Sequence, residues 1–180
     1  MASNQTYREL ADEALQRACG IGYDEFVSDL SPRIDRANQL LIQCEIQGRS
    51  PERFAELFCR KNKLVLVDDV GHDEAVEYNQ RRAAIIEFVA SSRWSMDTDG
   101  RAVLPTRNGE MFLDVVKRDG RYGFMAKIDN VGQCSRLDIG NAIVGLVTQM
   151  RRIPKRDAGD NNDLVQTNIE PQEQSGFSMR

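Results

Sequence analysis

The sequence is poor in the residues that most often carry metal or thiol chemistry. Among its 180 residues there is one histidine, His72, and there are four cysteines, none in a Cys-x-x-Cys pair. Zinc sites combine closely spaced cysteine and histidine ligands, so the sequence predicts no metal site and no cofactor. We expect the cysteines to be reduced thiols packed in the interior. They are Cys19, Cys44, Cys59 and Cys134.

Long apolar segments and targeting signals are also missing. No stretch approaches the roughly 20 apolar residues that a membrane span needs. The first residues contain neither a basic region nor an apolar region, which is unlike a secretory signal peptide. The sequence therefore predicts a cytoplasmic protein.

Known catalytic signatures are absent. The sequence contains no GxSxG, no HExxH and no P-loop, and each of these motifs supplies a specific nucleophile, metal site or phosphate cradle. We therefore expect no enzymatic activity. A metal-dependent hydrolase built on Asp68, Asp69 and Asp73 is the third-ranked alternative.

The charge is unevenly distributed. The whole chain carries a net charge of −4, and the residues after Arg156 alone sum to −4, so residues 1–156 are neutral. Binding to nucleic acid would therefore require a local basic patch. Residues 157–180 are polar and acidic, which predicts a disordered tail. We expect residues 1–156 to form a single α+β domain with a helical part, 1–62, and a sheet-containing part, 63–156.

Helical periodicity dominates the first half of the chain. Apolar residues recur at helical spacing over 4–18, 23–30, 32–48, 51–62 and 73–91. Two of these segments follow a Ser-Pro pair, Ser31-Pro32 and Ser50-Pro51, which supplies an N-cap and a proline at the first helical position. Between the last two helices, the apolar run 64–67 predicts one buried strand.

Two Asp-Gly pairs, Asp99-Gly100 and Asp119-Gly120, lie between alternating apolar and polar residues, which is a strong hairpin signal. They predict a four-stranded antiparallel meander over 94–98, 101–105, 110–118 and 121–129. A closing helix carries apolar residues from Ile139 to Met150, with a capping box at Ser135 and Asp138. The fold class is α+β.

The second Asp-Gly pair also predicts a register. It places Val115 opposite Phe124, Leu113 opposite Ala126 and Met111 opposite Ile128. All three pairs are apolar, and a shift by one residue would move them to the other face. On the other face, Phe112, Val116 and Met125 would form an apolar strip.

Two short segments resemble the receiver domain of response regulators. Residues 64–69 are similar to its first strand and acidic pair, and residues 112–116 lie where that family keeps its phosphoacceptor strand. The resemblance implies a parallel sheet with Asp114 as the phosphorylated residue. It covers these segments only, and the Asp119-Gly120 turn predicts an antiparallel neighbour for the Asp114 strand.

The function that these patterns favour is that of a non-enzymatic accessory or regulatory protein. It would act through protein–protein contacts or self-association, with Phe112, Val116 and Met125 as the contact surface. The alternative is a nucleic-acid-binding accessory protein that uses an arginine-rich hairpin tip and the basic end of the last helix. Its binding residues would be Arg107, Arg118, Arg121, Arg151, Arg152, Lys155 and Arg156.

The register predicts which side chains on the hairpin stabilise the fold. Leu113→Ala and Phe124→Ala should each lower the free energy of unfolding by roughly 2–5 kcal/mol, because each truncates a buried side chain. Lys127→Ala is the control and should have little effect. Urea denaturation measures all three, and equal small changes would show that the hairpin is assigned wrongly.

Overall fold

The computed structural model describes residues 5–26 and 34–152, and it has the predicted α+β architecture. Among these residues, six helices precede the sheet and one follows it. The helices are α1 (Tyr7–Cys19), α2 (Tyr23–Phe26), α3 (Ile34–Ile46), α4 (Pro51–Asn62), α5 (Val67–Val70), α6 (His72–Ala90) and α7 (Ile139–Arg152). The strands are β1 (Ser95–Met96), β2 (Ala102–Thr106), β3 (Gly109–Arg118), β4 (Arg121–Ile128) and β5 (Gly132–Arg136).

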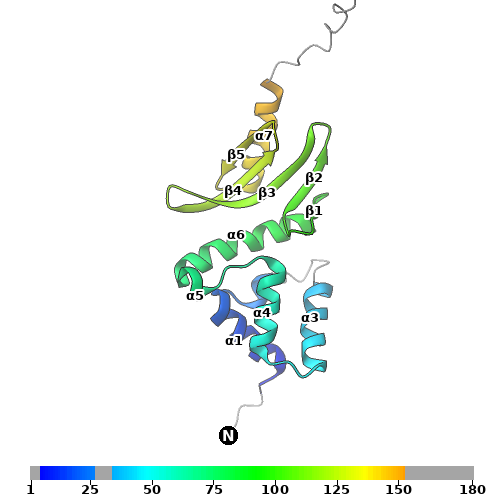
Figure 1. The fold of residues 1–180 in the computed structure, drawn as a ribbon, viewed down its shortest axis with the longest axis vertical. Helices are drawn as coiled ribbons and strands as arrows, with labels where there is room; N and C mark the ends of the chain where they lie inside the picture. The colour runs from blue at the N-terminus through cyan, green and yellow to red at the C-terminus, as the bar shows by residue number, and fades with distance from the viewer. Residues whose placement is uncertain (1–4, 27–33, 153–180) are drawn as a thin grey trace, which may run out of the picture.

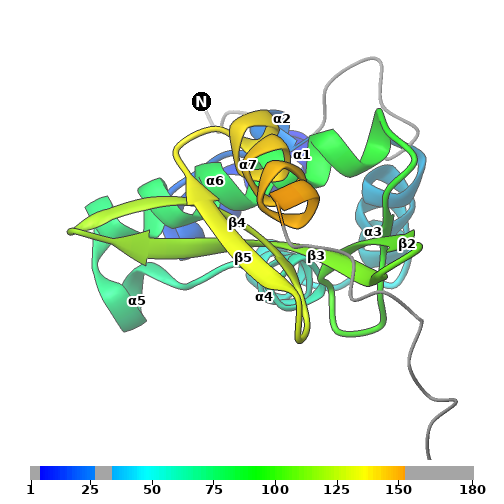
Figure 2. The ribbon, with the colours of Figure 1, turned by 90° about the horizontal axis from the view of Figure 1, so that it is seen from above.

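The elements form a helical layer and a sheet layer on either side of α6. In Figure 1, α1, α3 and α4 lie below α6, and the sheet with α7 lies above it. Seen from above in Figure 2, α7 lies across β4 and β5. The helix α6 is therefore the element that both layers share.

Each layer has its own hydrophobic core. The lower core is centred on Leu15, Tyr23 and Phe54, and the upper core on Leu113 and Leu146. One face of α6 packs on the lower core through Val76 and Ala83, and another packs on the upper core through Ile85 and Val89. All four cysteines are buried and unpaired, as expected. No helix in the described part of the chain is long and apolar enough to cross a membrane.

The helix starts follow from their capping residues. Thr6 accepts a hydrogen bond from the Glu9 amide, and Glu9 accepts one from the Thr6 amide, so α1 begins at Tyr7 rather than at residue 4. Ser50 caps α4 as predicted, with Pro51 at the first position. The Ser31-Pro32 start and the tail lie outside the described residues, and α2 is described only as far as Phe26.

The buried strand expected at 64–67 is wrong. Residues 64–66 belong to none of the described strands, and α5 begins at Val67 after the extended residue Leu66. The Asn79 side chain takes the place of a neighbouring strand, because it accepts from the Val65 amide at 3.0 Å and donates to the Val65 carbonyl at 2.9 Å. A side-chain amide can thus satisfy a backbone that an apolar run would otherwise place in a sheet.

The sheet is an antiparallel meander in the order β1-β2-β3-β4-β5. The predicted β3–β4 register is confirmed at every pair, including Leu113 opposite Ala126. Asp119 and Gly120 both have positive φ, 51° and 77°, as a type I′ turn requires. The other pair differs, because only Gly100 has positive φ and a longer loop, 97–101, joins β1 to β2.

The fifth strand was not predicted. Residues 132–136 of β5 include glycine, glutamine and serine, which have little strand propensity, yet Cys134 pairs opposite Ala126. The turn before β5 contains Asn130 with φ of 60°. The capping box expected at Ser135 is therefore wrong, since Ser135 lies in β5 and Asp138 caps α7 by accepting from the Asn141 amide at 2.9 Å.

The buried amide of Asn79 allows a test of the link between α6 and the helical layer. Asn79→Leu should lower the free energy of unfolding by at least about 3 kcal/mol, because it leaves buried peptide groups of Cys19 and Val65 without partners. The control is Gln80→Leu, an exposed neighbour on the same helix, which should change stability by less than about 0.5 kcal/mol. Equal effects in chemical denaturation would contradict the bridging role.

Candidate functional site

The candidate surface is the face of the sheet opposite α6 and α7, here called the outer face. Strand alternation places Val103, Phe112, Val116 and Met125 on it, and these four residues are named the outer strip. Val103 is buried, and the other three are half-buried. Neither hydrophobic core includes any of the four, because α6 and α7 pack against the opposite face.

An arginine lies over the aromatic residue of the outer strip. The guanidinium of Arg101 is 4.6 Å from the ring centroid of Phe112, which is the geometry of a cation–π contact. Asp97 holds this arginine at 2.8 Å, and Asp99 lies at 3.8 Å. The hydrogen bond to Asp97 raises the pKa of Arg101. The strip therefore has a charged residue fixed on its aromatic end.

The hairpin tip adds two more cations to the outer face. Arg118 and Arg121 face each other across the β3–β4 ladder, and both are exposed. Within residues 5–26 and 34–152, neither makes an ion pair. Like charges directly opposite each other are unfavourable, so the pair carries an uncompensated positive charge next to the outer strip.

The third basic residue at the tip, Lys117, makes an ion pair within the fold. It lies on the inner face, where its Nζ is 2.7 Å from Oε1 of Glu74. The Tyr122 hydroxyl donates to the same oxygen at 2.6 Å. Hydrogen bonds from Lys117 and Tyr122 lower the pKa of Glu74, and the hydrogen bond to Glu74 raises the pKa of Tyr122 to about 12. This contact anchors the tip to α6.

The basic residues of the nucleic-acid alternative do not form one patch. Arg107 lies in the β2–β3 turn, and Arg151 and Arg152 end α7, whose last turns pack near Gly132. Gly132 pairs with Ile128, which pairs with Met111 at the beginning of β3. These residues and the tip are separated by the length of β3, roughly 30 Å for ten residues. Lys155 and Arg156 lie outside the described residues.

The acidic candidates do not converge either. Asp68, Asp69 and Asp73 are exposed at the start of α5 and α6, and the described residues contain no cluster of three metal-ligating side chains. The resemblance to a receiver domain is wrong in its implied topology. Asp114 lies on an antiparallel strand, and its Oδ1 accepts a hydrogen bond from the next amide, of Val115.

Two residues of the outer face were missed from the sequence. Val103 completes the outer strip because it pairs with Phe112, and Arg101 covers Phe112. Finding them required the β2–β3 register, in which Thr106 pairs with Gly109 across a two-residue turn. The segment Thr106–Gly109, with Asn108 and Gly109, carried the signal for that turn.

Comparisons with protein-family models, with curated proteins and with solved structures found no match to this chain.

The Glu74 contact predicts a pH-dependent contribution to stability. Because the folded pKa of Glu74 is lowered from 4.5, its contribution is present above about pH 4.5 and is lost as the pH falls through the folded pKa. Glu74→Gln should therefore lower the melting temperature at neutral pH, and the difference from the parent should disappear in acid. Asp73→Asn, in the same first turn of α6, controls for the helix dipole. An equal pH dependence in both variants would contradict the anchoring role.

Proposed function

We propose that this chain is a non-enzymatic accessory or regulatory protein that acts through protein–protein contacts on the outer face of its sheet. The supporting observation is the outer strip, an apolar row that belongs to neither core and lies beside two arginines that make no ion pair with residues 5–26 or 34–152. An apolar patch with a charged rim is the usual composition of a binding surface.

The two arginines at the hairpin tip favour an acidic partner. Asp114, opposite Met125, places one carboxylate on the same face. Arg118 and Arg121 make no ion pair among the described residues, whereas the rim residue Lys127 is held by Asp129 at 2.8 Å. A symmetric dimer in which the two hairpin tips meet would bring these arginines toward their copies, and like charges at an interface are unfavourable. The partner that fits is an acidic segment with an apolar side chain for the outer strip.

A second candidate function is the binding of single-stranded nucleic acid. Phe112 and the two tip arginines lie on one sheet face, and such faces bind single strands by stacking and by phosphate contacts. Two observations weaken this function. The face offers one aromatic ring, which Arg101 already covers, and Lys117 is engaged by Glu74.

A binding assay with defined probes tests the proposal. A short labelled peptide in which Asp and Glu alternate with Leu and Val should bind the full chain, as measured by fluorescence anisotropy. Phe112→Ser combined with Met125→Ser should weaken binding by about tenfold or more, which is about 1.4 kcal/mol. Arg118→Glu with Arg121→Glu should do the same, and these exposed positions leave the core intact.

The matched control replaces exposed apolar residues outside the outer face. Ile46→Ser with Val144→Ser changes side chains on α3 and α7 that are 80% and 63% exposed, and it should leave peptide binding unchanged. Failure of the parent chain to bind the peptide would overturn the proposal. Binding of oligothymidylate that is lost in the arginine variant and kept in the Phe112/Met125 variant would support the second function instead.

A further inference from the structure

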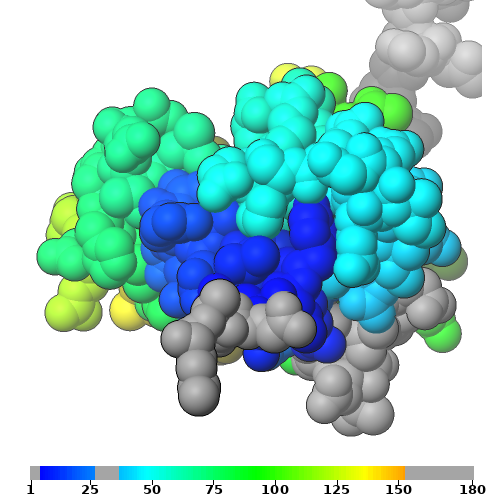
Figure 3. Space-filling model, turned by 90° about the horizontal axis from the view of Figure 1, so that it is seen from below, coloured from blue at the N-terminus to red at the C-terminus, as the bar shows by residue number. Residues whose placement is uncertain are grey.

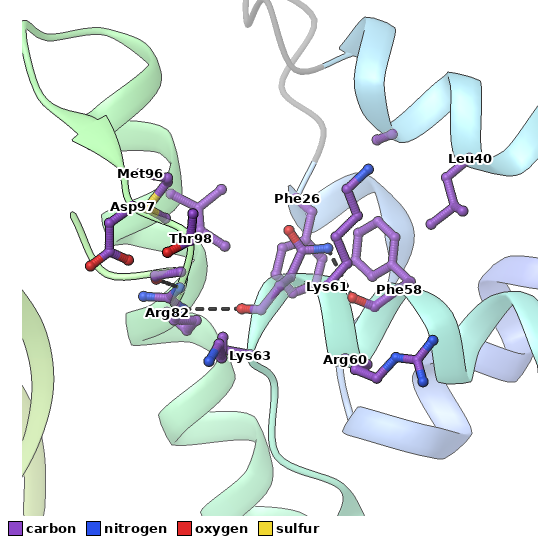
Figure 4. Close-up of a pocket in the computed structure, with 14 residues that line it drawn as sticks. Phe26, Leu40, Phe58, Arg60, Lys61, Lys63, Arg82, Met96, Asp97 and Thr98 are labelled. Atoms are coloured by element: carbon purple, nitrogen blue, oxygen red, sulfur yellow. Dashed lines mark hydrogen bonds between the residues drawn. The ribbon is translucent and has the colours of Figure 1, made fainter. Parts of the chain in front are cut away.

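A cleft of about 430 Å³ lies between the helical layer and the sheet layer. Its walls come from α2, α3 and α4 on one side and from α6 and the β1–β2 loop on the other, as Figure 4 shows. Figure 3 shows the molecule from below, where α1 (blue), α3 and α4 (cyan) form the surface of the helical layer that faces away from the sheet. The cleft is of the size that small-molecule sites usually have.

Arg82 lies on α6 at the boundary of this cleft and is buried, with 3% of its surface exposed. Its Nε donates to the Asn62 carbonyl at 3.0 Å, and its Nη2 donates to the Gly100 carbonyl. In the described part of the chain, Nη1 makes no hydrogen bond and no carboxylate lies within 4.0 Å. Burial lowers the pKa of Arg82, although an arginine stays charged in proteins.

A buried cation without an adjacent anion is unfavourable. Tyr78, Asp114 and Asp97 act on the pKa of Arg82 against the effect of burial. Asp97 is engaged by Arg101 at 2.8 Å, and Asp114 accepts from its own strand. A bound anion that accepts from Nη1 would compensate the charge of this guanidinium.

Three more cations line the cleft at the end of α4. Arg60, Lys61 and Lys63 are exposed, and none of them makes an ion pair with the described residues. Lys63 has left-handed backbone geometry, φ 59° and ψ 40°, and its stem lies against Gly100. A side chain at Gly100 would come within 2.9 Å of that stem and 3.4 Å of Arg82 Nη2. Because Gly100 has no side chain, the β1–β2 loop can pack closely against Lys63 and Arg82.

Asn62, Asp97 and Thr98 are polar residues of the remaining lining, and Asp97 is engaged by Arg101. The rest of the wall is mainly apolar. It includes Phe26, Leu40 and Met96, from α2, α3 and β1. Phosphate is the anion for which arginine and lysine are the common ligands, because arginine presents paired donors and lysine a compact charge. The apolar wall would contact a part of the ligand that carries no charge.

We propose that this cleft binds a small organic phosphate, such as a nucleoside diphosphate. Its phosphate oxygens accept from Arg82 Nη1 and from the cations that end α4, and its uncharged part packs against Phe26, Leu40 and Met96. The site is separate from the outer strip and does not depend on the function proposed for it.

Titration calorimetry on the full chain tests this assignment with three probes. ADP should bind, inorganic pyrophosphate should bind more weakly, and adenosine alone should give no detectable heat. Added salt should weaken ADP binding, because charges at the exposed rim are screened. Pyrophosphate binding as tight as that of ADP would overturn the assignment of an organic phosphate, and no binding of ADP would overturn the site.

Charge reversal at Lys61 and Lys63 tests whether the exposed cations of the cleft bind the phosphate. Lys61→Glu with Lys63→Glu should weaken ADP binding by about tenfold or more. Both side chains are exposed, so the melting temperature should stay close to that of the parent. Arg49→Glu with Arg93→Glu makes the same charge change at exposed positions outside the cleft and should leave binding unchanged. Equal affinity in both double variants would overturn the proposal.

Discussion

Two buried polar side chains hold α6 in place between the two layers: Asn79 bonds to the helical layer, and Arg82 bonds to both the helical layer and the β1–β2 loop. They lie three residues apart on one helix face. Asn79 bonds to the Cys19 carbonyl and to both peptide groups of Val65, and Arg82 bonds to Asn62 and Gly100. Each layer has its own apolar core, so these bonds determine how the C-terminal ends of α1 and α4 and the β1–β2 loop are held against α6. The cleft lies between the end of α4 and the β1–β2 loop, which Arg82 holds together.

Features set by neighbouring residues, such as turns and hairpins, could be predicted from the sequence. Features set by side chains from distant segments could not. Asp119 and Gly120 favour a tight turn because of their backbone sterics, and the position of this turn sets every β3–β4 pair. Strand alternation then determines the face of the sheet on which Phe112 and Met125 lie. The segment at 64–67 was assigned wrongly because its hydrogen-bond partner, Asn79, is 14 residues away and is a side chain. No local pattern distinguishes that arrangement from a buried strand.

The same division holds for the two candidate sites. Most of the outer strip follows from the β3–β4 hairpin and was visible as alternation in the sequence, whereas Val103 and Arg101 required the β2–β3 register. The cleft is lined from several elements. The basic residues that end α4 stand out in the sequence, but only the tertiary structure brings them to Arg82, which reads in the sequence as an ordinary helical arginine beside Arg81.

The distribution of ion pairs explains how a neutral body can present two positive surfaces. Glu74 is engaged by Lys117 and Tyr122, and Asp97 by Arg101. Each of these carboxylates is therefore used within the fold, while the cations at the hairpin tip and at the end of α4 make no ion pairs within the described residues. Net charge counts every group equally, but a binding partner meets only the charges that the fold leaves uncompensated. For this chain, the neutral composition of residues 1–156 therefore says little about its partners, and the two proposed sites are places where cations lie without a carboxylate partner among the described residues.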